Sequence, residues 1–196
     1  GQVIKYKSFF DRSGGGVTLS GGEPTLSIEF LSKLLQRFKK EDIHTILETA
    51  GLFNFDKFES LILPYTYIIY YDIKFINPVE HERYCGVTNE LILDNFIKLH
   101  NRSQSEHFDV MPRTPLIPGI TDNEINIRQI IEFYIEYNVN KAVFLPNNPA
   151  WLQKLERSGQ YINFDAEDPI RKLYDIEKEE KLKSYFLDNG IEIVFG

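Results

Sequence analysis

The sequence predicts an α/β fold in which parallel strands alternate with outer helices. Two observations support this prediction. Short runs rich in apolar, β-branched and aromatic residues alternate with segments of helical periodicity, and glycine or polar residues follow most of the short runs. This alternation of strands and helices is typical of a parallel sheet with right-handed crossovers. Five or six strands are too few for a complete eight-stranded barrel, so a partial barrel and an open doubly wound sheet both fit.

The strands are predicted from their composition and from the turn residues that bound them. Residues 17–20 are a short run that ends in glycines, and residues 67–74 are rich in aromatic and β-branched side chains. Prolines interrupt the extended segment 108–117. The predicted strands are residues 17–20, 44–49, 67–74, 108–117, 141–145 and 191–195.

The helices are predicted from apolar residues that recur every three or four positions. Residues 56–63 form a short helix before Pro64, and residues 169–189 form a long charged helix that Pro169 opens and Gly190 ends. The segment 146–168 is irregular and polar. The other three helices have predicted inward faces of Leu31, Leu34, Leu35 and Phe38; of Leu93, Phe96, Ile97 and His100; and of Ile127, Ile130, Ile131 and Tyr134.

Composition places limits on the function. The 196 residues are 42% hydrophobic and 26% charged, which predicts one globular domain spanning 1–196. The net charge of -7 and the pI of about 5.2 argue against nucleic acid as a partner. No apolar run reaches the ~18 residues that a membrane span needs. Cys85 is the single cysteine, so no intrachain disulfide can form, and a cytoplasmic location is expected.

Polar and glycine residues gather where the predicted strands end. Successive strand ends carry Gly21 to Glu23, then Glu48 and Thr49, then Asp72 and Lys74, then Arg113, and last Asn148. The carboxyl ends of parallel strands share one edge of the sheet, where ligands bind. A carboxylate and an ammonium together suit a zwitterion, and hard oxygens suit a small cation. Taken singly, each residue has an ordinary alternative as a loop, a helix cap or a solvated surface group.

In combination, these segments resemble the glycyl-radical-enzyme activating proteins, the relatives of pyruvate formate-lyase activase in the radical S-adenosylmethionine superfamily. The resemblance runs in order from about residue 10 to residue 160. It rests on the segments 13–24, 43–51, 72–74, 81–95 and 113–123. It implies a partial (β/α) barrel of the radical S-adenosylmethionine type.

The resemblance implies a role for each strand-end residue. Ser20, Gly21, Gly22 and Glu23 would bind the amino end of S-adenosylmethionine, and Lys74 would bind its carboxylate. Arg113 and Asn148 would lie beside the cofactor, and Glu48, Thr49 and Asp72 would hold a monovalent cation. The implied partners are a glycyl-radical enzyme as protein substrate and an electron donor such as flavodoxin or ferredoxin. The implied cofactors are S-adenosylmethionine and a 4Fe–4S cluster.

Two departures from the family pattern affect these expectations. The thirteen residues before Gly14 contain no cysteine, so the CxxxCxxC motif and the N-terminal β/α unit are expected to be missing, no catalytic residue is assigned, and the chain alone is expected to be inactive. Asn148 stands where relatives often have histidine. A cluster-less binding module without radical chemistry is therefore an alternative, as is an α/β domain that binds another small anion or nothing.

Overall fold

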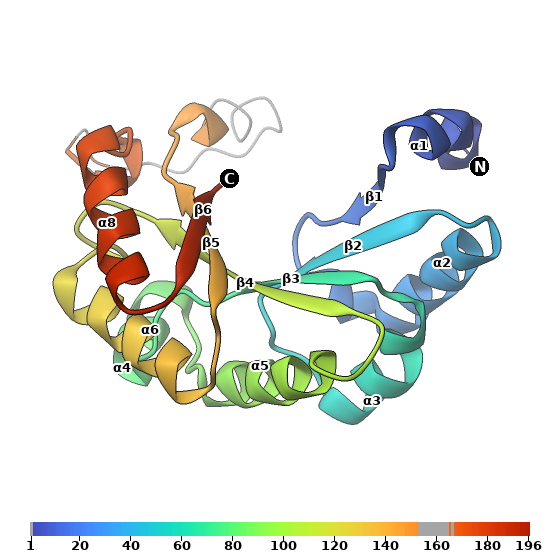
Figure 1. Cartoon of the computed structure of the whole chain (residues 1–196), viewed down its shortest axis with the longest axis horizontal. Helices are drawn as coiled ribbons and strands as arrows, with labels where there is room; N and C mark the ends of the chain where they lie inside the picture. Colours follow the sequence, from blue (N-terminus) through green and yellow to red (C-terminus); the bar gives the residue numbers. More distant parts are fainter. Residues whose placement is uncertain (1, 153–164, 166) are drawn as a thin grey trace. The chain divides into compact units, whose positions relative to one another are not determined.

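The computed structural model describes residues 2–152, 165 and 167–196. Its six strands follow one another in the sheet in the order of the chain, β1-β2-β3-β4-β5-β6 (Figure 1). β1 pairs with β2, β2 with β3, β4 with β5 and β5 with β6, all parallel. The α/β class and the parallel sheet predicted from the sequence are confirmed. The chain divides into two compact units, residues 1–73 with 90–111, and residues 74–89 with 112–196.

The first unit packs α2, α3 and α5 onto one face of β1, β2 and β3 (Figure 1). Its core includes Leu35, Leu47, Phe58, Ile69 and Phe96, which have no exposed surface. The backbone N–H of Asp109, at the start of β4, donates to Tyr67 O at 2.9 Å. The elements of this unit are η1 Val3–Tyr6, α1 Lys7–Ser13, β1 Gly16–Leu19, η2 Pro24–Ser27, α2 Ile28–Lys40, β2 His44–Thr49, α3 Phe55–Leu61, η3 Leu63–Tyr65, β3 Ile68–Asp72, α5 Glu90–Ser103 and the first residues of β4 Asp109–Leu116.

The second unit packs α6 and α8 against the remaining strands (Figure 1). The ring of Phe186 lies 4.9 Å from that of Phe144 and 6.5 Å from that of Tyr134, which places aromatic side chains from both helices against β5. Each of these three residues has no exposed surface. The elements of this unit are α4 Pro78–Cys85, the end of β4, α6 Glu124–Glu136, β5 Lys141–Pro146, η4 Pro169–Arg171, α8 Ile176–Asp188 and β6 Glu192–Phe195.

Alternate strand residues differ in burial, and this alternation positions the functional side chains. In β2, Thr45, Leu47 and Thr49 are buried, whereas Ile46 and Glu48 are partly exposed. Successive strand residues point to opposite faces, so Thr49 points into the helix-covered core. The open face carries Glu48, which pairs in register with Tyr70.

The observed secondary structure differs from the predicted one in three places. Two short helices, α1 and α4, were not predicted. Pro169 begins a three-residue 3₁₀ helix instead of the long helix; α8 begins later, where the Asp175 side chain accepts from Glu177 N–H as its N-cap. Most of the segment 146–168 lies outside the described residues. Within the described part of the chain, every helix is too short or too polar to cross a bilayer.

Candidate functional site

The segment after β1 is a glycine turn that ends at Glu23. Gly21 and Gly22 have φ values of 87° and 50°, in the left-handed region that side chains with a Cβ rarely adopt. A Cβ on either glycine would meet nothing within 4 Å. Backbone conformation, and not lack of space, is therefore what requires glycine at these two positions.

The Glu23 carboxylate joins the ends of β1 and β2. Its Oε1 accepts from Thr25 N–H at 3.1 Å, from the Thr25 hydroxyl at 2.7 Å and from the Thr49 hydroxyl at 2.9 Å. Its Oε2 accepts from Ala50 N–H at 2.7 Å. Because Oε1 takes three of these donors and Oε2 only one, Oε2 retains the capacity to accept from an ammonium group. Glu23 thus fixes the turn through these four hydrogen bonds, and its Oε2 has one acceptor position left for a ligand.

The backbone just beyond β2 is fixed by close packing. Gly51 has a φ of 85°, and a Cβ there would lie 2.0 Å from the Tyr71 hydroxyl oxygen. The Tyr71 hydroxyl donates to Ile92 O at 2.6 Å, and complete burial raises the pKa of Tyr71 well above its ordinary value, with a further contribution from the Glu23 charge. Tyr71 is therefore a neutral hydrogen-bond donor that holds α5 beside the end of β2.

The three residues expected to hold a monovalent cation do not share one face of the sheet. Glu48 lies on the open face, where its Oε2 accepts from the Ser20 hydroxyl at 2.5 Å. Asp72 follows Tyr70, the register partner of Glu48, by two positions and so lies on the same face. The Thr49 hydroxyl lies on the buried face, donates to Glu23, and accepts from Gly51 N–H at 3.0 Å. This hydroxyl thus lies on the other face of the sheet from Glu48 and Asp72, and the cation site expected from the three residues stays a prediction.

The second unit contains the other predicted cofactor residues. Lys74 is partly exposed and follows the end of β3 by two positions. Arg113 is a partly exposed residue of β4, in register with Val143. Asn148 is exposed, and its Oδ1 accepts from Ala150 N–H at 3.0 Å, which leaves its Nδ2 as a donor. It lines a cavity of about 340 Å³ at the ends of β4 and β5, whose wall includes Leu116, Leu145 and Trp151.

Three buried asparagines have a role that was not predicted from the sequence: each ties down a segment that follows a strand. Asn95 in α5 donates to Gly51 O and Phe53 O, both at 2.9 Å. Asn89 donates to Phe75 O at 2.6 Å and to Ile76 O at 3.0 Å, and Asn126 donates to Lys74 O. For Asn95 and Asn126, the available signal was a polar residue within the apolar stripe of α5 or α6.

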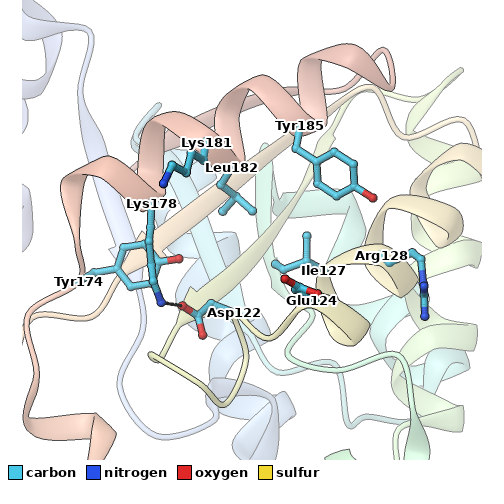
Figure 2. A pocket seen from close by; sticks show the side chains of 9 residues that line it. All are labelled: Asp122, Glu124, Ile127, Arg128, Tyr174, Lys178, Lys181, Leu182 and Tyr185. Atoms are coloured by element: carbon cyan, nitrogen blue, oxygen red, sulfur yellow. Dashed lines mark hydrogen bonds and ion pairs between the residues drawn. The ribbon is translucent and has the colours of Figure 1, made fainter.

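A separate cleft of about 570 Å³ lies between α6 and α8 (Figure 2). Its lining includes Asp122, whose carboxylate accepts from Gly119 N–H and lies 3.3 Å from the Lys178 ammonium. Burial and the neighbouring Asp122 raise the pKa of Tyr174. None of the predicted cofactor residues lines this cleft, so it is distinct from the candidate site.

The chain does not fit an iron–sulfur cluster by itself. Such clusters are held by three or four thiolates, and this sequence has one cysteine. Cys85 is exposed at the end of α4. Partial desolvation raises the pKa of its thiol, and the nearby Lys74 charge opposes that shift. Among the residues that the structure describes, no group of three or more His, Cys, Asp or Glu side chains is arranged to hold a metal ion.

Comparison with known proteins identifies relatives that are activating enzymes. The chain is 40% identical over 134 residues to a (2S)-3-sulfopropanediol dehydratase activating enzyme of Klebsiella oxytoca, covering 68% of this chain and 41% of that protein. It is 34% identical over 195 residues to a 4-hydroxyphenylacetate decarboxylase activating enzyme of Clostridioides difficile, covering 100% of this chain and 60% of that protein. It therefore spans roughly half the length of these relatives. No protein-family model matches the chain.

Solved structures of similar fold include a domain of an activating enzyme. A domain of a pyruvate-formate lyase-activating enzyme from Bacteroides vulgatus superposes with a TM-score of 0.72 at 25% identity, covering 93% of this chain and 99% of that domain. A radical SAM methyltransferase from Sphaerobacter thermophilus superposes with a TM-score of 0.70 at 13% identity, covering 100% of this chain and 55% of that one. The second match shows the fold alone. The chain belongs to the family of glycyl-radical-enzyme activating enzymes.

Proposed function

We propose that the chain supplies the S-adenosylmethionine-binding part of a radical enzyme that activates a glycyl-radical enzyme. The observation that carries the proposal is the Glu23 turn, a half-buried carboxylate fixed at the ends of β1 and β2 with one acceptor position left on Oε2, in a chain homologous to activating enzymes. The expected reaction is the reductive cleavage of the cofactor, followed by removal of a hydrogen from a glycine Cα of the partner protein.

The proposed roles follow the charges of the cofactor's methionine end. Its ammonium would be bound by the peptide oxygens of the glycine turn and by Glu23 Oε2, and its carboxylate by the Lys74 ammonium, with Arg113 adding positive charge nearby. Charge-assisted hydrogen bonds of this kind are about twice as strong as neutral ones.

The remaining predicted residues complete the proposed site. Ser20 positions the Glu48 carboxylate through the hydrogen bond between them. Glu48 and Asp72 share the open face of the sheet and would hold a monovalent cation. Asn148 would donate from Nδ2 to the cofactor, where a charged histidine would offer a positive group. Its place on the cavity with Trp151 suits a planar, largely apolar ligand group.

The second candidate is a cluster-less module that binds the cofactor or a partner without radical chemistry. Asn148 favours it, because an asparagine cannot carry the positive charge of a histidine. The two candidates differ in what a longer form of the protein must contain: radical chemistry requires thiolates supplied from outside this chain, together with an electron donor such as flavodoxin or ferredoxin.

The 196-residue chain alone is expected to release no 5′-deoxyadenosine from S-adenosylmethionine, because one cysteine cannot hold the cluster that supplies the electron. A longer gene product carrying CxxxCxxC upstream, reconstituted anaerobically with iron, sulfide and a reductant, is expected to release it. Chromatography of the quenched reactions measures the product. Release by the chain alone, or no release by the reconstituted longer protein, would contradict the proposal.

A further inference from the structure

Asn126 makes two hydrogen bonds that fix the backbone at a proposed cofactor residue. It lies in the first turn of α6 and is 3% exposed. Its Nδ2 donates to Lys74 O at 2.9 Å and to Thr121 O at 2.8 Å. Its own N–H donates to Asn123 Oδ1 at 3.0 Å, within the N-cap of the helix. The amide group is therefore anchored to the start of α6 and directed at the segment that follows β3.

The Oδ1 atom of Asn126 is buried and has no hydrogen-bond partner among the described residues. An unsatisfied buried acceptor is destabilising, and an apolar side chain at this position would avoid that cost. The two N–H donors are thus what distinguishes asparagine from an apolar residue here, and both are used on backbone oxygens.

The backbone from Lys74 to Ile76 lies beyond the end of β3 at Asp72. Three consecutive carbonyl oxygens in this segment accept from buried asparagines, that of Lys74 from Asn126 and those of Phe75 and Ile76 from Asn89. Since the side chain of Phe75 is also buried, the backbone is held in place at Lys74 and at the two residues that follow it.

We propose that Asn126 is a positioning residue for Lys74, holding its backbone so that the ammonium group stands where the carboxylate of an amino-acid-like cofactor binds. This inference rests on the proposed function for the identity of the ligand. The geometry of the Lys74 segment can also be tested without any ligand, so the positioning role of Asn126 and the proposed function can fail separately.

Cys85 provides the ligand-free test, because it is the single cysteine of the chain. Desolvation raises the pKa of its thiol, and the nearby Lys74 charge opposes that rise. The pH dependence of iodoacetamide alkylation measures that pKa. Lys74→Met is expected to raise it, Asn126→Ala to raise it towards the Lys74→Met value, and the double variant to match Lys74→Met.

The matched control for this test is Asn95→Ala. Asn95 is fully buried, makes two donor bonds to backbone oxygens, and also leaves Oδ1 without a partner among the described residues. This variant removes two side-chain hydrogen bonds of the same kind from a different segment. The Cys85 pKa is therefore expected to stay at the wild-type value. An Asn126→Ala variant with the wild-type pKa, or with the same change as Asn95→Ala, would overturn the inference, as would a wild-type pKa in Lys74→Met.

A second measurement uses titration calorimetry to compare the affinity of the chain for S-adenosylmethionine with its affinity for the decarboxylated analogue. The wild-type chain is expected to prefer the carboxylated form by about tenfold or more, as one charge-assisted hydrogen bond predicts. Asn126→Ala should lose most of this preference, and Asn95→Ala should keep it. If Asn126→Ala does not fold, Asn126→Ser retains one donor and should show an intermediate preference. Wild-type protein without any preference would contradict the proposed function, whereas full preference in the folded Asn126 variant would contradict the positioning role alone.

Discussion

Replacing Gly51 with alanine is expected to lower the free energy of unfolding by about 3 kcal/mol. An alanine in the left-handed region costs about 1–2 kcal/mol, and overpacking a filled core adds about 1–3 kcal/mol. Both costs apply at Gly51, whose φ is 85° and whose added Cβ would lie 2.0 Å from the Tyr71 hydroxyl. Tyr71 cannot easily move away, because it is fully buried and bonded to Ile92 O at 2.6 Å.

The control for this prediction is Gly21→Ala. Gly21 has almost the same φ, 87°, but an added Cβ there would meet nothing within 4 Å. Gly21→Ala should therefore show the backbone cost without the packing cost, about 1–2 kcal/mol. Urea unfolding of both variants measures the difference, and equal losses would show that the contact between Gly51 and Tyr71 carries no energy.

Replacing Glu23 with glutamine is expected to lower the free energy of unfolding by about 2 kcal/mol, because hydrogen bonds to a charged group contribute about 1.5–3 kcal/mol each. Glutamine keeps the length of the side chain but turns one acceptor oxygen into a donor. The carboxylate accepts on both oxygens, with Thr25 and Thr49 on Oε1 and Ala50 N–H on Oε2. In either orientation of the amide, its NH₂ group would face a donor.

Glu29→Gln is the matched control for this prediction. Glu29 has a side chain that is 68% exposed and lies 3.7 Å from the Lys57 ammonium. Exposed pairs of this kind contribute little, so the change should stay within about 0.5 kcal/mol of wild type. The Glu23 variant and this control are compared by urea unfolding. A Glu23 variant as stable as the Glu29 variant would mean that the carboxylate does not hold the two strand ends together.

Strand positions were largely predictable because they depend on local composition and on the turns that bound them. Residues 44–49 were predicted with the observed bounds. The inward face of α6 was also correct, since Ile127, Ile130, Ile131 and Tyr134 are all buried. The short helices α1 and α4 escaped prediction. α1 has no buried residue and α4 has one, so neither shows a marked apolar stripe.

The inward face of α5 shows why a polar residue in a core misleads sequence analysis. The predicted face included Leu93 and Ile97, but the buried stripe runs through Ile92, Asn95, Phe96, Leu99 and His100. Asn95 occupies a core position because its amide satisfies two backbone oxygens of the segment after β2. Such a partner is distant in the sequence, and periodicity alone cannot reveal it.

The sequence predicted which residue types lie at the strand ends. It did not predict which face of the sheet each side chain occupies or which hydrogen bonds it makes. Strand ends supplied the expected glycines, carboxylates and lysine. The separation of Thr49 from Glu48 follows from the alternation of strand side chains, but which face the helices cover depends on long-range packing. The several protein donors to Glu23 likewise come from a turn geometry that the sequence does not display.

The most direct test of the account is a titration of S-adenosylmethionine into the wild-type chain and into Lys74→Ala, followed by calorimetry. The account predicts that the wild-type chain binds the cofactor and that removal of the Lys74 ammonium weakens binding by about tenfold or more. Equal affinity in the two proteins, or no binding to the folded wild-type chain, would contradict the claim that these strand ends bind the cofactor's methionine end.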